Sequence, residues 1–598
     1  MLVYGDVECI GTVRDRQKAI GILLDRVNAL PPGSERHAAL IAAFIGASEL
    51  IRAIIDADFQ AHGFDTPSPA HVNGMECLSL LAQTVVRSWQ SGFSQAALPD
   101  AFRGRLLSFD PTLTIRTKQA EGYAFYALYP ESYVEAATRS GLGPETRVIG
   151  IRSIGAGLAA LVAEALGARP PFTVRPVGHP FQREITVDPS FADTLTQEKG
   201  TAVAVVDEGP GLSGSSFGAV ADWLESIGIS RDRIHFFPSH TGALGLKASL
   251  HHRERWNGAS RHFVSMDELL CGSADRLRSW VETVVGPLTG ELEDVSGGAW
   301  RTLRYSDRTS WPAANIQQER RKFLARTKGS TWLVKFAGLG ESGVKKHARA
   351  LQLHQAGFTP EIAGYCHGFL IERWHGDAPS LDQHSMDPSR LVTRIGTYLG
   401  FRARTCPVRT HDGASLAELR TMALHNAEQA LGEPSARALD RALPDIETLS
   451  DAMNRVSTDN RMMPWEWLLC GDRAIKADAL DHCAAHDLVG CQDITWDIAA
   501  AAVEFGLSEP DTRHLRDIVQ RESTLPVSPA LLSFMLPCYL AFQLGAHTMA
   551  ADALQHSDEE DRLRRAANRY ATLLQAFLWS IGLERKTGST FSHDAPAS

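Results

Sequence analysis

Hydrophobic positions recur at three- and four-residue steps between Arg14 and Gly92, which is the period of amphipathic helices. The apolar positions are Ile20, Leu23, Leu24 and Val27, and then Leu40, Ala43, Phe44 and Ala47. The segment Pro31–Gly33 breaks the first helix from the second. We therefore predict a helical N-terminal region over residues 1–112, which could be a cap or the contact surface of a homo-oligomer.

Short apolar runs that alternate with helical stretches distinguish residues 113–285. The predicted strands are Tyr123–Leu128, Arg147–Ile151, Phe172–Val177, Thr201–Val206 and Arg233–Phe237. Amphipathic stretches at Leu158–Leu166 and Phe217–Ile227 follow the second and the fourth of these strands. A repeated order of strand, loop and helix predicts an α/β domain with a doubly wound parallel sheet.

The last half of the chain has a third pattern. A stretch rich in Gly, Ser and charge, Gly286–Ser310, predicts a linker. Two strand-like runs, Trp332–Phe336 and Phe369–Trp374, then precede a long helical region that continues through Leu583. We predict a two-lobed α+β domain over residues 300–590, with a small lobe at 300–376 and a helical lobe at 377–590.

Composition narrows the class of protein. The 598 residues are 44% hydrophobic and 22% charged, which predicts several packed domains. The net charge of -10 argues against a nucleic-acid partner, because binding phosphates requires a basic face. The most apolar run, Ala38–Ser48, ends at Glu49 and Arg52, too short for a membrane span. We expect a cytoplasmic protein with no membrane partner.

The nine cysteines are scattered and form no CxxC pair, so a disulfide framework is not expected. One group of possible metal ligands lies within a short segment: Cys470, His482, Cys483, His486 and Cys491. Its spacing matches no common zinc motif. Zinc there is the less favoured alternative.

The strongest local motif follows the apolar strand Ala202–Val206. Two acids, Asp207 and Glu208, lead into a Gly/Ser loop over residues 209–216, and a helix begins near Phe217. Backbone N–H groups in such a loop, aided by the positive end of the helix, can hold a phosphate group. The two carboxylates can bind ribose hydroxyls or magnesium.

This segment resembles the phosphoribosyl-diphosphate (PRPP) motif of type I phosphoribosyltransferases. The resemblance implies catalytic contacts to ribose from Asp207 and Glu208. It also implies 5′-phosphate binding by Gly211, Ser213, Gly214, Ser215 and Ser216. The loop departs from the family pattern, because Gly209–Gly211 makes it one residue longer.

Two further segments lie in the order that this family requires. Val148–Gly157 resembles the diphosphate-binding strand and loop, with Arg152, Ser153, Gly155 and Gly157 as binding residues. The basic segment 175–183 would bring Arg175, His179 and Arg183 to the diphosphate. The implied reaction is displacement of diphosphate from PRPP, or its reverse, with Mg²⁺. Ser239 and His240, which follow a later strand, could contact the base or acceptor.

In the last half, Lys335 lies among apolar residues of a strand. Kinases use such a lysine to hold ATP phosphates, and usually pair it with a glutamate of the next helix. The helix predicted at Val344–Ala356 contains no acid. The segment Phe369–Gly376 resembles the strand and hinge of aminoglycoside-phosphotransferase-like kinases. The resemblance implies that Lys335 and Glu372 bind ATP.

The helical lobe carries three acids in the order that this kinase family uses. Asp459 would be the catalytic carboxylate, and Glu466 and Asp478 would bind magnesium. Seven residues rather than five separate the first two, and glutamate replaces asparagine. An alternative alignment makes Asp487 the metal ligand and Asp478 catalytic. Downstream, Gln492–Ala499 resembles a segment whose second acid, here Asp497, supports the catalytic loop.

Together these patterns predict a bifunctional transferase that acts on small molecules. The middle domain would transfer a phosphoribosyl group, and the C-terminal domain would phosphorylate a small molecule with ATP and Mg²⁺. Nucleoside or sugar-phosphate metabolism would suit both reactions. The alternative is a regulatory protein that senses nucleotides through two degenerate folds. Consumption of ATP that depends on Asp478 would distinguish the two hypotheses.

Overall fold

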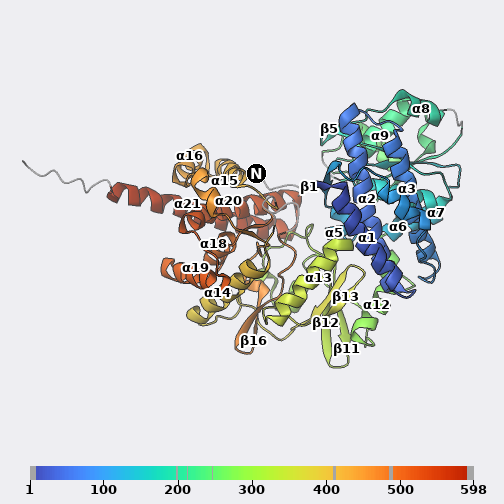
Figure 1. The fold of residues 1–598 in the computed structure, drawn as a ribbon. Helices are drawn as coiled ribbons and strands as arrows, with labels where there is room; N and C mark the ends of the chain where they lie inside the picture. The colour runs from blue at the N-terminus through green and yellow to red at the C-terminus, as the bar shows by residue number, and fades with distance from the viewer. Residues whose placement is uncertain are drawn as a thin grey trace, which may run out of the picture.

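A computed structural model describes residues 8–196, 200–211, 213–245, 247–408, 412–483 and 489–588. The helices and sheet of the first 285 residues form one body, and the C-terminal helices form another (Figure 1). A small sheet with helix α13 lies between them. The protein therefore has mixed helix and sheet in three consecutive parts.

The N-terminal part is helical, and a short strand pair closes it. Its elements are β1 (Glu8–Thr12), α1 (Val13–Ala29), α2 (Ser34–His62), α3 (Pro69–Gln90), α4 (Asp100–Leu107) and β2 (Thr114–Lys118). Thr12 and Asp15 form a capping box that begins α1, and Ser68 with Pro69 begins α3. β1 pairs antiparallel with β2. The predicted boundary near residue 112 thus falls just before the strand that completes this pair.

Two helices are long and apolar enough to cross a membrane by length and composition. They are α2 and α20 (Pro529–Ala553), and 83% and 67% of their most apolar windows are buried inside the protein. Helix α2 is apolar on nearly all sides because it contacts α1, α3, α7 and α13. Its composition is thus that of a core helix.

The middle part contains a five-stranded sheet in the order β4-β3-β7-β8-β9. The strands are β3 (Arg147–Ile151), β4 (Phe172–Val174), β7 (Val203–Val206), β8 (Ile234–Phe237) and β9 (Ser260–Arg261), and all neighbouring pairs are parallel. Helix α7 (Gly155–Leu166) packs on one face with the N-terminal helices, and α9 (Ser215–Ser226) packs on the other. Four of the five predicted strands therefore lie in one doubly wound sheet.

The middle part contains further short helices and one hairpin. They are α5 (Glu121–Phe125), α6 (Pro130–Arg139), β5 (Val177–His179), β6 (Gln182–Glu184), α8 (Pro189–Thr196), α10 (Leu250–Gly258), α11 (Met266–Cys271) and α12 (Arg276–Val285). The strand predicted at Tyr123–Leu128 is wrong, because this segment begins as helix α5. A short apolar run that is buried on all sides has no period that distinguishes helix from strand.

The third part begins with an antiparallel sheet in the order β10-β11-β12-β14-β13. Its elements are β10 (Glu293–Asp294), β11 (Lys322–Thr327), β12 (Ser330–Phe336), α13 (Gly340–Gln355), β13 (Ile362–Cys366) and β14 (Phe369–Arg373). The predicted linker is not a free connection. Its strand β10 joins this sheet, and its buried Arg301 forms an ion pair with Glu559 at 2.9 Å.

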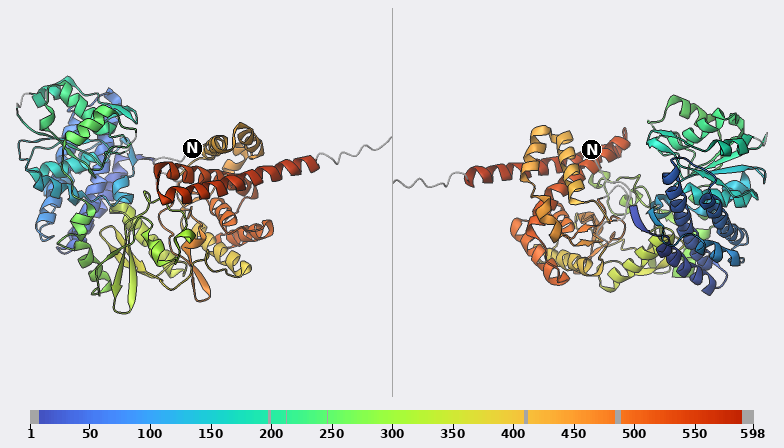
Figure 2. Two further views of the ribbon diagram at one scale, coloured as in Figure 1. Left: turned by 180° about the vertical axis from the view of Figure 1, so that it is seen from behind. Right: turned by 45° about the horizontal axis from the view of Figure 1, so that its top comes forward.

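The C-terminal lobe is mainly helical. Its helices are α14 (Pro388–Thr405), α15 (Leu416–Leu431), α16 (Glu433–Ala442), α17 (Ile446–Leu449), α18 (Thr495–Glu504), α19 (Glu509–Ser523), α20 (Pro529–Ala553) and α21 (Asp558–Gly588). Two short antiparallel pairs complete it: β15 (Arg455–Val456) with β18 (Gln492–Asp493), and the hairpin of β16 (Trp467–Cys470) with β17 (Arg473–Lys476). Helix α21 runs beside α20 and projects from the body (Figure 2).

The hydrophobic core does not follow the three parts of the chain. One continuous cluster contains the N-terminal helices, one face of the parallel sheet, and small-lobe residues such as Phe336 and Phe369. A second cluster fills the C-terminal lobe and includes small-lobe residues such as Leu353 and Leu370. The small lobe therefore contributes residues to both cores.

Candidate functional site

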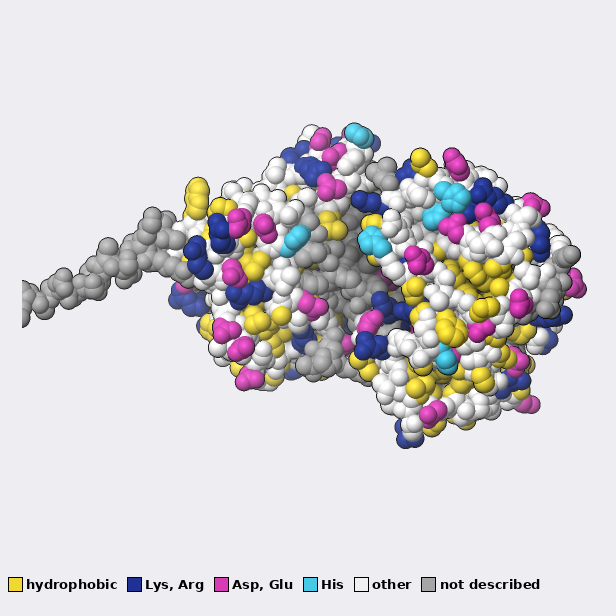
Figure 3. Space-filling view, turned by 90° about the horizontal axis from the view of Figure 1, so that it is seen from above, with side chains coloured by type: hydrophobic (Ala, Val, Ile, Leu, Met, Phe, Trp, Pro, Cys, Tyr) yellow, Lys and Arg dark blue, Asp and Glu magenta, His cyan; other side chains and the backbone are white. Residues whose placement is uncertain are grey.

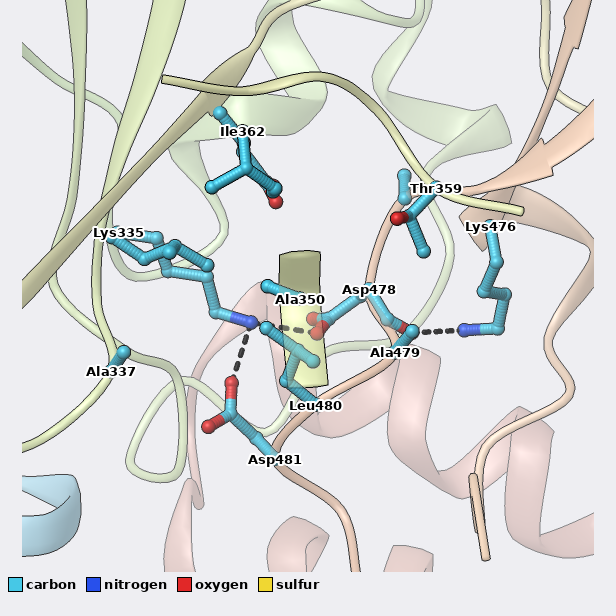
Figure 4. A pocket seen from close by; sticks show the side chains of 13 residues that line it. Lys335, Ala337, Ala350, Thr359, Ile362, Lys476, Asp478, Ala479, Leu480 and Asp481 are labelled. Atoms are coloured by element: carbon cyan, nitrogen blue, oxygen red, sulfur yellow. Dashed lines mark hydrogen bonds and ion pairs between the residues drawn. The ribbon is translucent and has the colours of Figure 1, made fainter. Parts of the chain in front are cut away.

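A hollow lies between the small lobe and the C-terminal lobe, and charged side chains gather in it (Figure 4). Lys335 comes from β12 and Glu372 from β14, while Asp478 and Asp481 follow β17. Lys335 Nζ lies 2.6 Å from a carboxylate oxygen of each aspartate. The structure thus brings together three residues that the sequence assigned to ATP and metal binding, and adds Asp481.

Strand geometry places Lys335 in this hollow. Lys335 pairs with Leu370 and Leu333 with Glu372, so alternate side chains of β12 and β14 share one face of the sheet. Burial alone lowers the pKa of Lys335, but Asp478 and Asp481 raise it more, so the pKa lies above its ordinary value. Burial raises the pKa of Glu372 to about 7. Lys335 therefore stays charged, and Glu372 is easily protonated.

Helix α13 supplies a cation where kinases supply an acid. Lys346 is buried, and its Nζ lies 2.7 Å from Asp481 Oδ1. Asp481 thus bridges Lys346 and Lys335, and the loop after β17 provides the carboxylate that the helix lacks. The sequence indicated the missing acid but not its replacement. A dense run of ionisable residues after Asp478 was the available signal.

The predicted catalytic loop is held in the predicted way. The backbone N–H groups of Asp459 and Asn460 donate to Asp497 at 2.7 and 2.8 Å. Burial raises the pKa of Asp497 to about 7, and the charge of Asp459 raises it as well. Asp497 at the start of α18 therefore fixes the loop backbone, as the downstream segment predicts.

The carboxylate of Asp459 is placed differently from a solvent-facing catalytic base. Its side chain is fully buried, the Tyr398 hydroxyl donates to it, and Arg402 Nη1 lies 3.8 Å away. The described residues that line the hollow include Asp478 but not Asp459. Tyr398 and Arg402 both come from α14. No motif near Asp459 in the sequence indicates this contact.

Glu466, Asp478 and His482 form a possible metal group, with ligand atoms within 4.8 Å of one another. His482 Nε2 is buried without a hydrogen-bond partner, and burial holds the pKa of its ring well below its ordinary value. Two carboxylates and a neutral imidazole can hold a divalent cation. Lys476 competes, because its Nζ lies 2.8 Å from Glu466 and 3.5 Å from Asp459.

The alternatives raised for this segment have different outcomes. His486 and Asp487 lie outside the described residues. The described cysteines do not form the five-membered zinc group: Cys483 contacts Ser457, whereas His482 joins Glu466 and Asp478.

A second set of predicted residues meets at the carboxyl edge of the parallel sheet. The strand order reverses between β3 and β7, and ligands of α/β sheets bind outside the strand ends at such a point. Asp207 and Glu208 follow β7 there, and Gly155 begins α7 after β3. A β-carbon on Gly155 would lie 3.1 Å from Asp207 Oδ1, so the glycine permits this close approach.

The two acids are only partly exposed to solvent. Asp207 Oδ1 is buried without a hydrogen-bond partner, and burial raises the pKa of Asp207 to about 8. Glu208 lies against helix α5, and burial raises its pKa to about 7. Tyr133 donates to the Asp207 carbonyl oxygen at 2.8 Å. Both carboxyl groups can therefore be neutral near pH 7.

The predicted phosphate loop leads into helix α9, with Gly214 in the left-handed conformation at the N-cap. Ser215 and Ser213 are buried, and Ser215 Oγ donates to the Pro180 carbonyl oxygen at 2.7 Å. Pro180 is at the tip of the β5–β6 hairpin. The hairpin therefore occupies donors that would bind a phosphate, while Gly211 is exposed and Ser216 is half-buried.

The basic residues predicted near this loop are distributed differently. Arg152 was predicted to bind substrate, but its guanidinium is fully buried and ion-paired with Asp56 and Asp65. Arg175 also pairs with Asp56, at 2.6 Å. These acids lie in α2 and in the segment after it, so they neutralise both arginines. The prediction for Arg152 is corrected because its partners lie far away in the sequence.

Smaller differences concern the remaining predicted contacts. Gly157 faces Ser48 of α2 rather than the sheet edge, so it serves helix packing. Ser153 is exposed next to the start of α7. His179 and Arg183 lie on the exposed β5–β6 hairpin, where Arg183 binds the Gly178 carbonyl oxygen at 2.7 Å. Beyond β8, Ser239 is half-buried and His240 is exposed.

The surface seen from above is hollowed between the first half and the C-terminal lobe (Figure 3). Basic and acidic side chains are interspersed on this face. No single-sign field covers the described part of it.

The small sheet with Lys335, the helix beside it, the helical lobe and the loop supported by Asp497 together define a kinase-like C-terminal half. No protein-family model matches the sequence, and no curated protein matches it. Solved structures similar to this chain over about half its length include small-molecule kinases.

One is the choline kinase LicA from Streptococcus pneumoniae, at 15% identity and a TM-score of 0.27, covering 42% of this chain and 89% of that chain. Another is a choline/ethanolamine kinase family protein from Mesorhizobium loti, at 14% identity and a TM-score of 0.28, covering 51% of this chain and 99% of that chain. A third is the spectinomycin phosphotransferase APH(9)-Ia in complex with ADP and spectinomycin, at 11% identity and a TM-score of 0.32, covering 50% of this chain and 93% of that chain.

Proposed function

We propose that the C-terminal half binds a nucleoside triphosphate with magnesium between its lobes and phosphorylates a hydroxyl group of a small molecule. The observation that carries this proposal is the meeting of Lys335 and Asp478 in one hollow, with Glu466 beside them. A triphosphate bound with a divalent cation requires a lysine for its phosphates and acids for the cation. Here the lysine and the acids come from opposite lobes.

Each group has a distinct role in this proposal. Lys335 would bind the phosphates after release from Asp478, and Glu466 and Asp478 would hold magnesium. Magnesium would supply neutralisation of the phosphate charge. Asp459 would orient the acceptor hydroxyl, for which its carboxylate has to turn away from Tyr398. Lys476 lies between the acids and could stabilise charge on the transferring group.

The test compares Asp478→Asn with Asp472→Asn, because Asp472 is an exposed residue of the neighbouring hairpin turn. Calorimetric titration with ATP and Mg²⁺ measures binding, and ADP formation with a panel of small hydroxyl compounds measures transfer. We expect Asp478→Asn to lower ADP formation by about 100-fold or more and Asp472→Asn to have no effect. Equal activity in the two variants would contradict the proposal.

The alternative, a nucleotide sensor, is supported by the burial of Asp459 and by the placement of Lys476 among the acids. Binding of ATP without any ADP formation in the same experiment would favour it. The two hypotheses share the binding site and differ only in turnover.

For the middle domain we propose a PRPP-type site at the carboxyl ends of β3 and β7. The reversal of strand order there and the unpaired Asp207 Oδ1 support this proposal. Binding requires the β5–β6 hairpin to leave Ser215. Titration with PRPP and Mg²⁺ should show binding that Asp207→Asn removes and that Asp232→Asn, at the opposite, exposed end of the sheet, retains. No binding by the unaltered protein would exclude the site.

A further inference from the structure

Two histidines and one glutamate meet in the interior where the first half joins the kinase-like half. His37 lies in α2, Glu131 in α6, and His367 in the turn between β13 and β14. Their side chains are at most 4% exposed. Three segments separated by 94 and 236 residues thus place their polar groups in a dry interior. Neither proposed reaction uses these residues.

The donor atoms of this trio converge on one point. Glu131 Oε1 lies 3.0 Å from His37 Nε2 and 2.7 Å from His367 Nε2, and the three ligand atoms are mutually within 4.8 Å. The second carboxylate oxygen, Oε2, is buried and has no hydrogen-bond partner. An unpaired carboxylate oxygen in the interior is destabilising unless it has a ligand. Both imidazoles and both oxygens together offer four donors.

The surroundings of the trio resemble the outer shell of a metal centre. His37 Nδ1 lies 2.8 Å from Ser88 Oγ. A hydrogen on Nδ1 that bonds this hydroxyl leaves Nε2 free to bind a metal, and such second contacts are usual for ligating histidines. Phe93 lies 4.8 Å from the His37 ring, and Trp280 lies 5.1 Å from the His367 ring. These rings exclude water.

The turn that carries His367 is held in an unfavourable backbone conformation. His367 has a φ of +35°, which side chains other than glycine rarely adopt. The Tyr129 hydroxyl donates to the His367 carbonyl oxygen at 2.7 Å and fixes the turn. Strain of this kind persists where the surrounding structure requires one side-chain position. Here that position is the imidazole against Glu131.

We propose that His37, Glu131 and His367 bind one zinc ion, which fastens the first half to the kinase-like half. Imidazole and carboxylate donors suit Zn²⁺, and a closed set of four donors is typical of a structural site. Donors from different ligands of a four-coordinate zinc lie about 3.3 Å apart, so the ring nitrogens of His37 and His367 would move away from Glu131 Oε1 by roughly 0.3 and 0.6 Å. The closed interior leaves no open coordination position for a substrate.

The same three side chains could instead form only hydrogen bonds, with both imidazoles donating to Glu131. This arrangement leaves Glu131 Oε2 unpaired, whereas zinc pairs it. The two interpretations differ in one measurable respect: only the first makes the stability of the protein depend on zinc.

The test uses the full chain without an affinity tag, produced in medium with added zinc chloride. We expect elemental analysis to find about one zinc per chain, and removal with a chelator to lower Tm by roughly 5 °C or more. Zinc added back restores Tm. Cobalt in place of zinc should show the visible bands of a tetrahedral centre.

Variants assign the ion to this site. Glu131→Gln and His367→Asn should lose the zinc, and Ser88→Ala should weaken its binding by about 10- to 100-fold without loss of the fold. His262→Asn, in the His235–His262 pair elsewhere in the first half, is the matched control. Asp478→Asn removes the other possible metal group, and this variant should retain its zinc.

Two results would overturn the proposal. One is a full chain that contains no first-row metal and whose Tm does not change when it is refolded with zinc chloride. The other is a folded Glu131→Gln variant that keeps the same zinc content as the unaltered protein. Neither result depends on whether the kinase or PRPP proposal is correct, because metal content and Tm are independent of turnover.

Discussion

Asp481 shows how one residue changes the character of the interlobe site. Its carboxylate oxygens lie 2.6 Å from Lys335 Nζ and 2.7 Å from Lys346 Nζ, and all three side chains are buried. Burial lowers the pKa of Lys346, and the charge of Asp481 raises it, so the pair is interdependent. A buried ion pair adds little stability by itself, but loss of one partner leaves an uncompensated charge.

We therefore predict that Asp481→Asn lowers the stability of the protein by about 3 to 5 kcal/mol, because Lys346 loses its carboxylate. The double variant Asp481→Asn with Lys346→Met should recover part of this loss. Calorimetric Tm values check both. Asp517→Asn, in an exposed surface pair, should change Tm little. A double variant less stable than Asp481→Asn would contradict the interpretation.

Asp207 makes a second prediction, which concerns pH. Its folded pKa of about 8 lies above the ordinary value of 3.8, so the folded state binds more protons than the unfolded state in this range. The stability contributed by the neutral carboxyl is complete below the unfolded pKa and is lost as pH rises through the folded pKa.

Asp207→Asn lacks this titration and should therefore gain stability relative to the unaltered protein as pH rises. The expected gain between pH 5 and pH 8 is on the order of 4 kcal/mol, since each pH unit over which only the folded state holds the proton is worth about 1.4 kcal/mol. Tm measured across this range for both proteins gives the difference. A constant difference would mean that Asp207 keeps an ordinary pKa.

At the scale of elements, helix α5 is the contact between the two proposed sites. Gly122 lies against Glu208 on one side. On the other, the Tyr123 carbonyl oxygen accepts the N–H of Leu339 at 2.8 Å, and Phe125 lies under Lys346 at 5.2 Å. This helix of five residues therefore contacts Glu208 of the middle part and Lys346 of the charged cluster beside Lys335.

We predict that Gly122→Ala destabilises the protein by about 1 to 3 kcal/mol, because its β-carbon would meet Glu208 and lie 2.9 Å from Leu128 Cδ2. Gly104→Ala in α4 is the matched control, because a β-carbon there meets nothing within 4 Å. It should be neutral or slightly stabilising. Equal Tm values for the two variants would show that α5 can yield at this contact.

At the scale of the whole molecule, packing divides the chain differently from sequence. Small-lobe residues of β11, β12 and β14 share a core with the N-terminal helices, whereas α13 and Leu370 of the same lobe belong to the core of the C-terminal lobe. The small lobe is therefore packed against the first half on one side and against the C-terminal lobe on the other.

This division predicts the behaviour of a chain that begins at residue 287. It would expose the face around Phe336 and Phe369 that the first half covers, and exposed apolar faces of this kind associate. We expect such a chain to form aggregates and to bind a hydrophobic dye more strongly than the full chain. Light scattering and dye fluorescence measure this. A stable monomer would mean that the shared core contributes little.

The sequence by itself determined the elements whose causes are local. Strand β3 has the predicted limits, α9 begins within the predicted loop, and Asp497 supports the loop at Asp459. Alternation, helix caps and glycine-rich turns act over a few residues, so they are legible in one segment. The order of acids after β15 could be predicted for the same reason.

Only the tertiary structure decided which side chains are available. Arg152 meets Asp56 across 96 residues, and Tyr398 meets Asp459 across 61. His37 and Glu131 meet His367 only because three distant segments share one core. A motif specifies the type and order of its residues, but burial and charge pairing depend on partners that the fold brings from elsewhere. Those partners determine whether a predicted ligand is free to bind.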